Sequence, residues 1–399
     1  GDVYKRQTWR YGMDIKEITK SYKDYVIKLR REFHENPEKS MEEVRTSKRV
    51  KEELDKIGIP YVSAGGTGVI ATIKGANPGK TVALRGDMDA LQVVECTDVE
   101  YKSKNEGLMH ACGHDGHTSM LLGAAKVLND IKDSINGTVK LFFQPGEEVG
   151  KGARAMIQDG AMEGVDSVFG IHLWTDVESG TISVEEGPRM ASADFFKITV
   201  KGRGGHGSLP HQGVDAVLAS SAIVMNLQSM VSREVSPLEP LVVSVGVLNS
   251  GTRFNVIASE AILEGTIRLF NPELRKQIPG ILERIAKSTA EAYRADAELE
   301  YGYLTPAVIN DKECSKIATD AAIKLFGEDC ITLFEKVTGA EDLAEFMNIA
   351  PGALAFVGAR NESKGACYPH HHGCFNIDED VLEIGTALYV QYAVDFLNK

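Results

Sequence analysis

Residues 81–89 read TVALRGDMD, an apolar run that ends in two acidic residues. The run has the length and the branched side chains of a buried strand, and it delivers Asp87 and Asp89 at its carboxyl end. Residues 138–148, TVKLFFQPGEE, repeat the arrangement with a pair of adjacent glutamates. Because chemistry in open α/β sheets collects at the carboxyl ends of the strands, these two segments predict a parallel sheet with a functional edge.

Strand and helix signals alternate on both sides of these segments, which is typical of an α/β domain with a mostly parallel sheet. The expected helices lie at 15–33, 41–57 and 120–128, and the expected strands at 68–75, 167–174 and 352–359. Asp115 is placed to cap the third helix. The sequence NPGK at 77–80 predicts a hairpin turn between the strand at 68–75 and the next one.

From about residue 192 the order changes to strand, helix, strand, strand, helix, strand. This order is the ferredoxin-like plan, in which one sheet carries two helices on one side. After about residue 305 the first style resumes. We therefore expect a discontinuous catalytic domain at 13–190 and 305–399, interrupted by a lid or dimerisation domain at 191–304. Residues 1–12 fit nothing that follows, and we interpret them as a non-native tail.

Composition narrows the class of protein. The chain has 399 residues, an ordinary apolar content of 43% and a net charge of −13. That acidic balance argues against nucleic acid or an anionic membrane as a partner. We find no apolar run long enough to span a membrane and no signal peptide. The six cysteines are spread thinly, so we expect no disulfide framework and a reducing, cytoplasmic location.

Four short blocks of the chain contain candidate metal donors: Cys112, His114, Glu148, His172 and His371. Cys112 and His114 are two residues apart, so in an extended segment both side chains face one side. Zn²⁺ prefers thiolate and imidazole donors, and a carboxylate widens the choice toward Mn²⁺ or Co²⁺. For Cys112 and His114 alone, a buried free cysteine beside a hydrogen-bonded histidine is the better interpretation. The other donor blocks reverse that preference.

Glu147 is adjacent to Glu148, and the two side chains cannot point the same way from a regular strand. One can bind metal while the other accepts a proton from a metal-activated water. Acidic pairs are more often solvated turns, but this pair ends an apolar strand. Asp87 or Asp89 can orient a ligand histidine, and loop hydrogen bonding is an equally good alternative. His206, in the glycine-rich segment GRGGHG, can stabilise a developing oxyanion.

Further histidines flank these donors. His110 and His117 surround Cys112 and His114, and we expect them to support the site rather than to bind metal. Of the triplet at 370–372, only one member is expected to be a ligand.

Together these blocks resemble the M20 metallopeptidases, specifically the amidohydrolase subfamily that contains hippurate hydrolases, auxin-conjugate hydrolases and N-acetyl-diaminopimelate deacetylases. The resemblance extends from about residue 14 to residue 398. It rests on the motifs REFHENPE, LRGDMDAL, MHACGHDGHTSMLLGAA, FFQPGEE, GIHLW, GRGGHGSLPH, FNVI with EGTIR, GAEDL and HHHGCFNIDED.

The resemblance implies two divalent metal ions per subunit, with Zn²⁺ preferred and Mn²⁺, Co²⁺ or Ni²⁺ as alternatives. The implied ligands are Cys112, His114, Glu148, His172 and His371. Glu147 is implied as general base and acid, with Asp89 as a supporting acid. The lid residues His206, Asn255 and Arg268 are implied to hold the scissile carbonyl and the substrate carboxylate. The lid is also implied to form a homodimer. Gly146 departs from the alanine that often precedes the glutamates in the family.

We therefore predict a hydrolase that cleaves the amide bond of an N-acyl amino acid into a carboxylic acid and an amino acid. A dipeptidase or carboxypeptidase of the same family is the alternative substrate class. A thiol hydrolase, with Cys112 as nucleophile and His114 as base, is a further hypothesis. The last alternative is an inactive metal-binding or scaffold protein, against which the presence of Glu147 argues.

Overall fold

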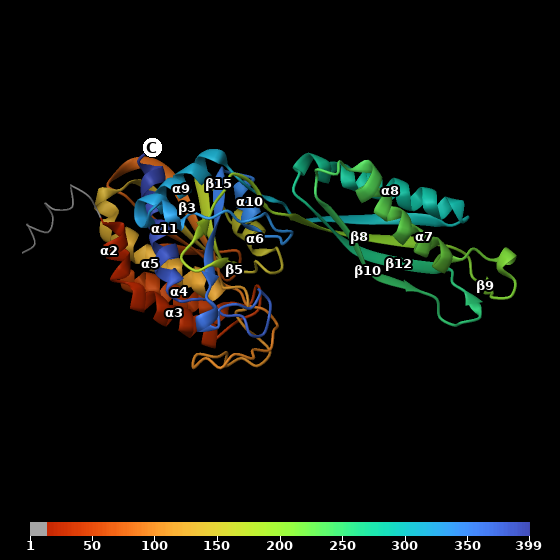
Figure 1. Cartoon of the computed structure of the whole chain (residues 1–399), viewed down its shortest axis with the longest axis horizontal. Coiled ribbons are helices and arrows are strands. Elements are labelled where there is room, and N and C mark those ends of the chain that lie inside the picture. Colours follow the sequence, from red (N-terminus) through yellow and green to blue (C-terminus); the bar gives the residue numbers. More distant parts are fainter. Residues whose placement is uncertain (1–13) are drawn as a thin grey trace, which may run out of the picture. The chain divides into compact units, whose positions relative to one another are not determined.

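The structure is a computed structural model that describes residues 14–399, so the predicted tail at 1–12 lies outside the described residues. Contacts divide the chain into two compact units (Figure 1). The first contains residues up to 187 with 310–335 and 345–399; the second contains 188–309 with 336–344. Within residues 14–399, no helix is both long enough and apolar enough to cross a membrane. The cytoplasmic location stays a prediction.

The first unit is built on a seven-stranded sheet in the order β1-β2-β4-β3-β5-β15-β6. Its strands are β1 (Tyr61–Ala64), β2 (Gly68–Lys74), β3 (Asn77–Asp87), β4 (Asn136–Gln144), β5 (Ser167–Glu178), β6 (Ile182–Ser183) and β15 (Gly352–Arg360). The four strands β4, β3, β5 and β15 run parallel, and the pairings outside them are antiparallel. The predicted α/β fold is confirmed.

Helices cover this sheet and supply the rest of the core. They are α2 (Ile15–Lys20), α3 (Lys23–Glu35), α4 (Val44–Ile57), α5 (His114–Ile131), α6 (Gly152–Gln158), α9 (Lys312–Phe326) and α11 (Val381–Leu397). In β4, Leu141 and Phe143 join the main apolar cluster, whereas Phe142 packs against Phe346 with ring centroids 5.2 Å apart. Both faces of the strand are therefore covered, which explains its continuous apolar run.

Three local predictions were wrong. The expected helix at 15–33 is two helices, α2 and α3, separated by Ser21 and Tyr22. The NPGK segment is not a hairpin turn, because it opens β3, and β2 pairs with β4 instead. Helix α5 begins at His114 with Gly113 as its N-cap at φ 84°, so Asp115 is not the cap. The Asp115 side chain is instead buried against Arg30.

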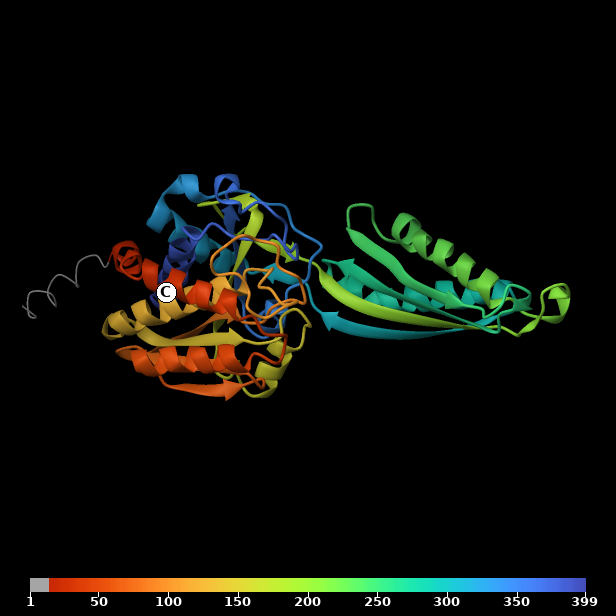
Figure 2. The same cartoon turned by 90° about the horizontal axis from the view of Figure 1, so that it is seen from below.

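The second unit has the predicted ferredoxin-like order. Its elements are β8 (Ser192–Lys201), β9 (Gly205–His206), α7 (Ala216–Ser229), β10 (Leu241–Ser250), β11 (Val256–Ile257), β12 (Glu260–Leu269), α8 (Pro272–Ala292) and β13 (Asp296–Thr305). The antiparallel sheet has the order β10-β12-β8-β13, with α7 and α8 on one face (green to cyan in Figures 1 and 2). At the unit boundaries lie β7 (Gly187–Met190), β14 (Val308–Asn310) and α10 (Leu343–Met347).

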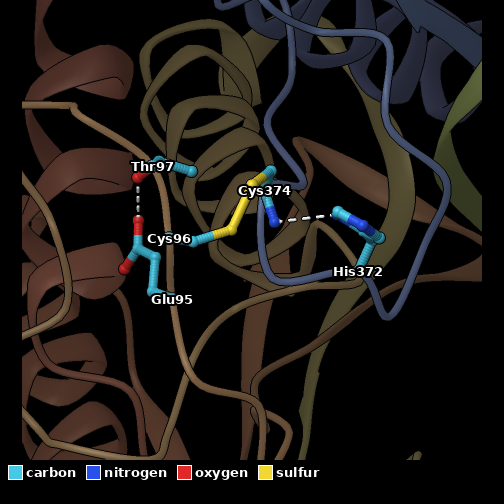
Figure 3. The surroundings of a disulfide bond; sticks show 5 residues. All are labelled: Glu95, Cys96, Thr97, His372 and Cys374. Carbon is cyan, nitrogen blue, oxygen red and sulfur yellow. Dashed lines mark hydrogen bonds between the residues drawn. A yellow bond between two sulfur atoms is a disulfide. The ribbon is translucent and has the colours of Figure 1, made fainter.

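One disulfide joins distant parts of the first unit. Cys96 and Cys374 are bonded across a sequence separation of 278 residues, with their Cα atoms 5.2 Å apart (Figure 3). The remaining cysteines are free: Cys112, Cys314, Cys330 and Cys367. The expectation of no disulfide framework therefore missed one bond, because cysteine spacing carries no information about contacts between loops so far apart in sequence.

Candidate metal centre

The candidate site lies at the carboxyl edge of the parallel strands. The register of β3 and β4 pairs Asp87 with Gln144, so the loops that follow these strands leave the sheet side by side. The first of those loops carries Asp89, and the second carries Glu147 and Glu148. Strand β5 contributes His172, α5 begins at His114, and the loop between β15 and α11 supplies His371. The candidate donors therefore lie at the carboxyl edge of the sheet, as predicted from the acidic residues at the ends of two strands.

The five predicted donors fall into overlapping groups whose ligand atoms lie within 4.8 Å of one another. Cys112, His114 and His172 form one group, and Cys112, Glu148 and His371 form another. Because Cys112 belongs to both, the side chains offer two adjacent cation positions that share a thiolate. A third group joins His114 to Glu147 and Glu148.

Distances between donor atoms match the spacing around a cation better than they match hydrogen bonds. Cys112 Sγ is 3.7 Å from His172 Nε2, and Glu148 Oε1 is 3.4 Å from His371 Nε2 and 3.8 Å from His114 Nε2. Two ligands of one tetrahedral Zn²⁺ lie roughly 3.3–3.8 Å apart, given metal–ligand bonds of about 2.0–2.3 Å. His114 Nε2 and Glu148 Oε1 are buried with no hydrogen-bond partner among the described residues. A bound cation would satisfy both atoms.

Hydrogen bonds fix the ring nitrogens that face this space. His172 donates from Nδ1 to the carbonyl of Leu173 at 2.8 Å, and His114 donates from Nδ1 to the carbonyl of Asp89 at 2.9 Å. In each ring the lone pair of a neutral imidazole is then on Nε2, the atom directed at the other donors.

Asp89 organises both halves of the site. Its carboxylate accepts the backbone N–H groups of Glu147 and Glu148, each at 3.1 Å, and the Ser40 hydroxyl at 2.6 Å. The same carboxylate lies 3.3 Å from His114 Nδ1. Burial alone would raise the pKa of Asp89, but the hydrogen bonds from His114 and Ser40 outweigh it and lower the pKa. Asp89 is therefore an ionised anchor for the glutamate turn and for one donor ring.

The electrostatics of the donor set favour a cation. Burial lowers the pKa of His114, but Asp87, Asp89 and Glu148 outweigh burial and raise it to about 10. Burial, followed by the charges of Glu148, Glu147 and Asp87, raises the pKa of the Cys112 thiol well above its ordinary value. A thiol held protonated in this way makes a poor nucleophile, which argues against the thiol hydrolase hypothesis. A divalent ion would offset the surplus negative charge and permit the thiolate.

The flanking histidines have supporting contacts. His117 Nδ1 lies 2.6 Å from Asp87, and its Nε2 accepts the N–H of Leu173 at 2.9 Å, so both nitrogens are engaged. His370 donates from Nε2 to the carbonyl of Leu173 and packs against Trp174. These contacts leave His371 as the member of the triplet that reaches the donor groups.

Two further residues support the glutamate turn, and the sequence analysis missed the first of them. Glu43 is buried and accepts the N–H of Gly146 at 2.8 Å, next to the glutamate pair. Gly146 has φ +57°, and a Cβ there would lie 2.3 Å from the sulfur of Met41. An alanine at this position would therefore be strained, and the Met41 side chain would have to shift to make room for it. Glu43 lies in the segment MEE, and nothing in that segment distinguishes a buried carboxylate from an exposed one.

Within the second unit, the predicted catalytic residue His206 lies next to Asn255, one of the two predicted substrate-binding residues. Exposed His206, in β9, pairs with Val256 in β11, next to Asn255. The Nδ1 atom of His206 accepts from the Ser208 hydroxyl at 2.8 Å, which leaves Nε2 as the outward atom. Arg268 is half-buried near Asp194 at the other end of the sheet, paired with Ala193.

The chain resembles known proteins along nearly all of its length. The sequence profile described as peptidase family M20/M25/M40 matches residues 83–395, a range that contains all five donors. The N-acyl-L-amino acid amidohydrolase of Geobacillus stearothermophilus is 45% identical over 302 residues, 75% of this chain and 82% of that protein. Thermostable carboxypeptidase 2 of Saccharolobus solfataricus is 44% identical over 392 residues, 97% of this chain and 98% of that protein. A solved Bacillus subtilis structure, described as a dinuclear metal binding peptidase from the M20 family, has a TM-score of 0.85 at 35% identity, covering 95% of this chain and 99% of its own.

Proposed function

Because this chain belongs to peptidase family M20/M25/M40 and to its amidohydrolase subfamily, whose members hydrolyse amide bonds, we propose that its substrates are N-acyl amino acids. The products would be a carboxylic acid and a free amino acid. The observation that carries this proposal is the convergence of Cys112, His114, Glu148, His172 and His371 in two groups that share one thiol, with Glu147 beside them.

In the proposed mechanism those five residues hold two divalent ions, which when bound acidify a water and polarise the scissile carbonyl. Glu147 accepts the proton of the attacking water and then gives it to the nitrogen of the departing amino acid. Its side chain is mostly buried, at 9% exposure, so few solvent molecules compete for that proton. Asp89 keeps the glutamate turn in place while the proton moves.

Carboxypeptidase activity is the second candidate, and it is supported by the 44% identity to thermostable carboxypeptidase 2. Both reactions release an amino acid with a free α-carboxylate, and they differ only in the acyl side. Arg268 is our candidate for that carboxylate, because its guanidinium is half-buried and its pKa is lowered by burial.

A substrate panel with the metal-loaded protein separates the two activities. Hippurate and N-acetyl amino acids represent the first class, and dipeptides with a free amino terminus represent the second. C-terminally amidated versions of both test the requirement for the carboxylate. Our proposal expects kcat/KM to be highest for the acyl amino acids and to collapse on amidation. Dipeptides cleaved faster than every acyl amino acid would reject it in favour of the peptidase.

We propose Zn²⁺ as the native metal, because one thiolate and three imidazoles are donors that zinc prefers. Mn²⁺, Co²⁺ and Ni²⁺ are the alternatives that the carboxylate donor permits. Elemental analysis of protein purified without added metal tests this choice. Two zinc ions per chain are expected, and a different dominant metal would overturn the assignment.

We also propose a homodimer formed through the second unit. Strand β10 lies at the edge of its sheet and exposes Val242, Val247 and Leu248. Helix α7 exposes further apolar side chains, Leu218 and Met225 among them. A free edge strand next to apolar surface favours pairing with another chain.

The separation of the lid residues also supports a dimer. His206 lies beyond the end of β8, where Lys201 pairs with Glu260. Arg268 is eight residues from Glu260 along β12, which corresponds to about 26 Å of strand. One small substrate cannot touch both residues of the same lid, so two lids sharing each site would explain their presence.

Light scattering of Leu248→Glu tests the dimer, with Val62→Glu as the control at an exposed apolar position of the first unit. We expect the first variant to be monomeric and the control dimeric. A wild-type chain that is monomeric at micromolar concentration would reject the proposal.

A further inference from the structure

Among the five donors, His371 depends most on the position of its loop. Its side chain is 55% exposed, whereas that of His114 is 1% and that of Glu148 is 12%. Its backbone has φ +65°, a left-handed conformation that L-residues adopt infrequently and that contacts with the surrounding structure stabilise. One such contact is the bond from its N–H to the carbonyl of Ala111, at 2.8 Å. Little packing around the side chain therefore holds the ring in place.

The Cys96–Cys374 disulfide supplies a covalent attachment three residues after His371 (Figure 3). The two loops also touch through their backbones, because the N–H of Cys96 donates to the carbonyl of Gly373 at 2.8 Å. At Gly373 the loops are so close that a Cβ would lie 2.5 Å from the carbonyl oxygen of Val94. The loop that carries His371 is thus fixed to the loop at 94–97.

The loop at 94–97 is in turn anchored beside another donor. Glu95 is buried and accepts from His34 Nε2 at 3.1 Å and from the N–H of Ser103 at 2.7 Å. The other nitrogen of His34 lies 2.7 Å from Asp115, the residue after His114. A continuous chain of contacts therefore runs from His114 through His34 and Glu95 to the disulfide and on to His371.

We propose that Cys96 and Cys374 are positioning residues for His371, and that their thiol or disulfide state sets the affinity of the cation held by Cys112, Glu148 and His371. This inference rests on the proposed metal function. With the disulfide intact, the loop holds the His371 ring toward Glu148. With it reduced, a half-exposed ring on a left-handed residue loses its covalent attachment, and that cation position loses one donor.

The redox step is a two-electron exchange. Two molecules of a glutathione-type thiol reduce the bond, giving two cysteine thiols and one external disulfide. The reverse reaction consumes the external disulfide and releases two external thiols. Cys96 is exposed, so a small thiol can reach the bond. The opposite group, Cys112 with His114 and His172, is buried and has no covalent tie to the loop of His371.

Metal titration of four metal-free proteins tests the proposal. They are oxidised wild type, wild type reduced with a phosphine, the double variant Cys96→Ser/Cys374→Ser, and Cys330→Ser as a control at a free cysteine. Thiol counting under denaturing conditions verifies the states, with four thiols in oxidised wild type and six after reduction. Circular dichroism verifies that each protein is folded.

In oxidised wild type and the control, two equivalents of Co²⁺ should bind tightly. In the double variant and in reduced wild type, the first equivalent of Co²⁺ should bind with unchanged affinity and show the charge-transfer band of the Cys112 thiolate. The second equivalent should bind about 10- to 100-fold more weakly. The phosphine should not alter the double variant further. Reduction of folded wild type keeps the test decisive if the double variant misfolds.

Two outcomes separate this inference from the function on which it rests. Tight binding of two equivalents in all four proteins would overturn the role of the disulfide and leave the metal site intact. Failure of oxidised wild type to bind two equivalents would overturn the dinuclear site and the inference with it. Equal weakening of both equivalents would also overturn the inference, because it would indicate general destabilisation rather than loss of His371.

Discussion

Glu147 and Glu148 are neighbours in sequence, but their side chains have different surroundings. Those surroundings suit Glu148 to metal binding and Glu147 to proton transfer. Both side chains belong to the group at His114, but only Glu148 also belongs to the group with Cys112 and His371. Both backbone N–H groups bind the one carboxylate of Asp89, so the turn is fixed while the two side chains diverge. A fixed turn suits a proton carrier, because the carrier's pathway must be short and reproducible.

Glu147→Gln should therefore retain two metal ions while its kcat falls by about 10²- to 10⁴-fold, because the amide cannot accept a proton from water. Steady-state hydrolysis assays with an N-acyl amino acid measure kcat, and elemental analysis measures the metal content. Glu163→Gln, at an exposed carboxylate, is the matched control. Turnover close to wild type in Glu147→Gln would refute the proton-transfer role.

The glutamate turn also depends on a glycine. Gly146→Ala should destabilise the protein by about 1–3 kcal/mol, because a left-handed backbone disfavours a side chain and the new Cβ meets the Met41 sulfur. Gly164→Ala is the control, because Gly164 has φ +69° with nothing within 4 Å of an added Cβ. Urea unfolding should show a smaller loss in Gly164→Ala. Adding Met41→Ala to Gly146→Ala should recover part of the difference, and no recovery would contradict the proposed clash.

At the scale of elements, His34 connects helix α3 to the start of α5 and to the loop at 94–97. Both ring nitrogens face carboxylates, an arrangement that only the protonated imidazole satisfies with two donated bonds. Burial and Arg30 lower the pKa of His34, but the hydrogen bonds to Asp115 and Glu95 outweigh them and raise it. A raised pKa in the folded state contributes stability that is fully present below the unfolded value and is lost as pH rises through the folded value.

The free energy of unfolding of His34→Gln should thus fall below that of wild type by about 2–4 kcal/mol near pH 6, with both proteins metal-free and oxidised. The gap should narrow as the pH rises above the ordinary histidine pKa of 6.5, because the unfolded chain then loses its imidazole proton while the folded protein still holds one. It should be lost as the pH passes through the raised pKa of the folded state. Urea unfolding at several pH values measures it. His211→Gln, at an exposed histidine, should show no such trend, and a pH-independent gap for His34→Gln would rule out the charged pair.

The elements that the sequence predicted well are those with one strong local signal. Apolar runs located β4, β5 and β15, and the alternation of strand and helix signals predicted the order of elements along the second unit. The errors arose where distant contacts decide the outcome. The partner of β2 is β4 rather than its sequence neighbour β3, and the Asp115 side chain binds Arg30 instead of capping a helix. The supporting role of Glu43 could not be predicted for the same reason, because its burial depends on tertiary packing.

The donor residues themselves were identifiable because each lies in a motif with a resemblance to a known family. Their grouping around the Cys112 thiol was not, because it depends on loops that leave different strands. The roles of His206, Asn255 and Arg268 stay predictions.

At the scale of the whole molecule, the two units have separate apolar cores. The core of the second unit is formed by residues between Phe196 and Ala297, all within the inserted segment. We therefore expect residues 188–309, produced alone, to fold. Urea unfolding followed by circular dichroism should be a single cooperative transition with a slope of about 1–3 kcal/mol per molar. A gradual, non-cooperative change would show that the segment needs the rest of the chain.

Strand β15 fills the gap in the first sheet between β5 and β6, and His371 follows it. Both emerge from the ribosome only after the inserted unit has been synthesised. Until then the nascent protein carries four of its donors beside a sheet edge at β5 that awaits its neighbour. A message cut short just before residue 352 would therefore yield a polypeptide with most of its mass, with four of the five donors and with an unpaired edge at β5 that favours association with other chains.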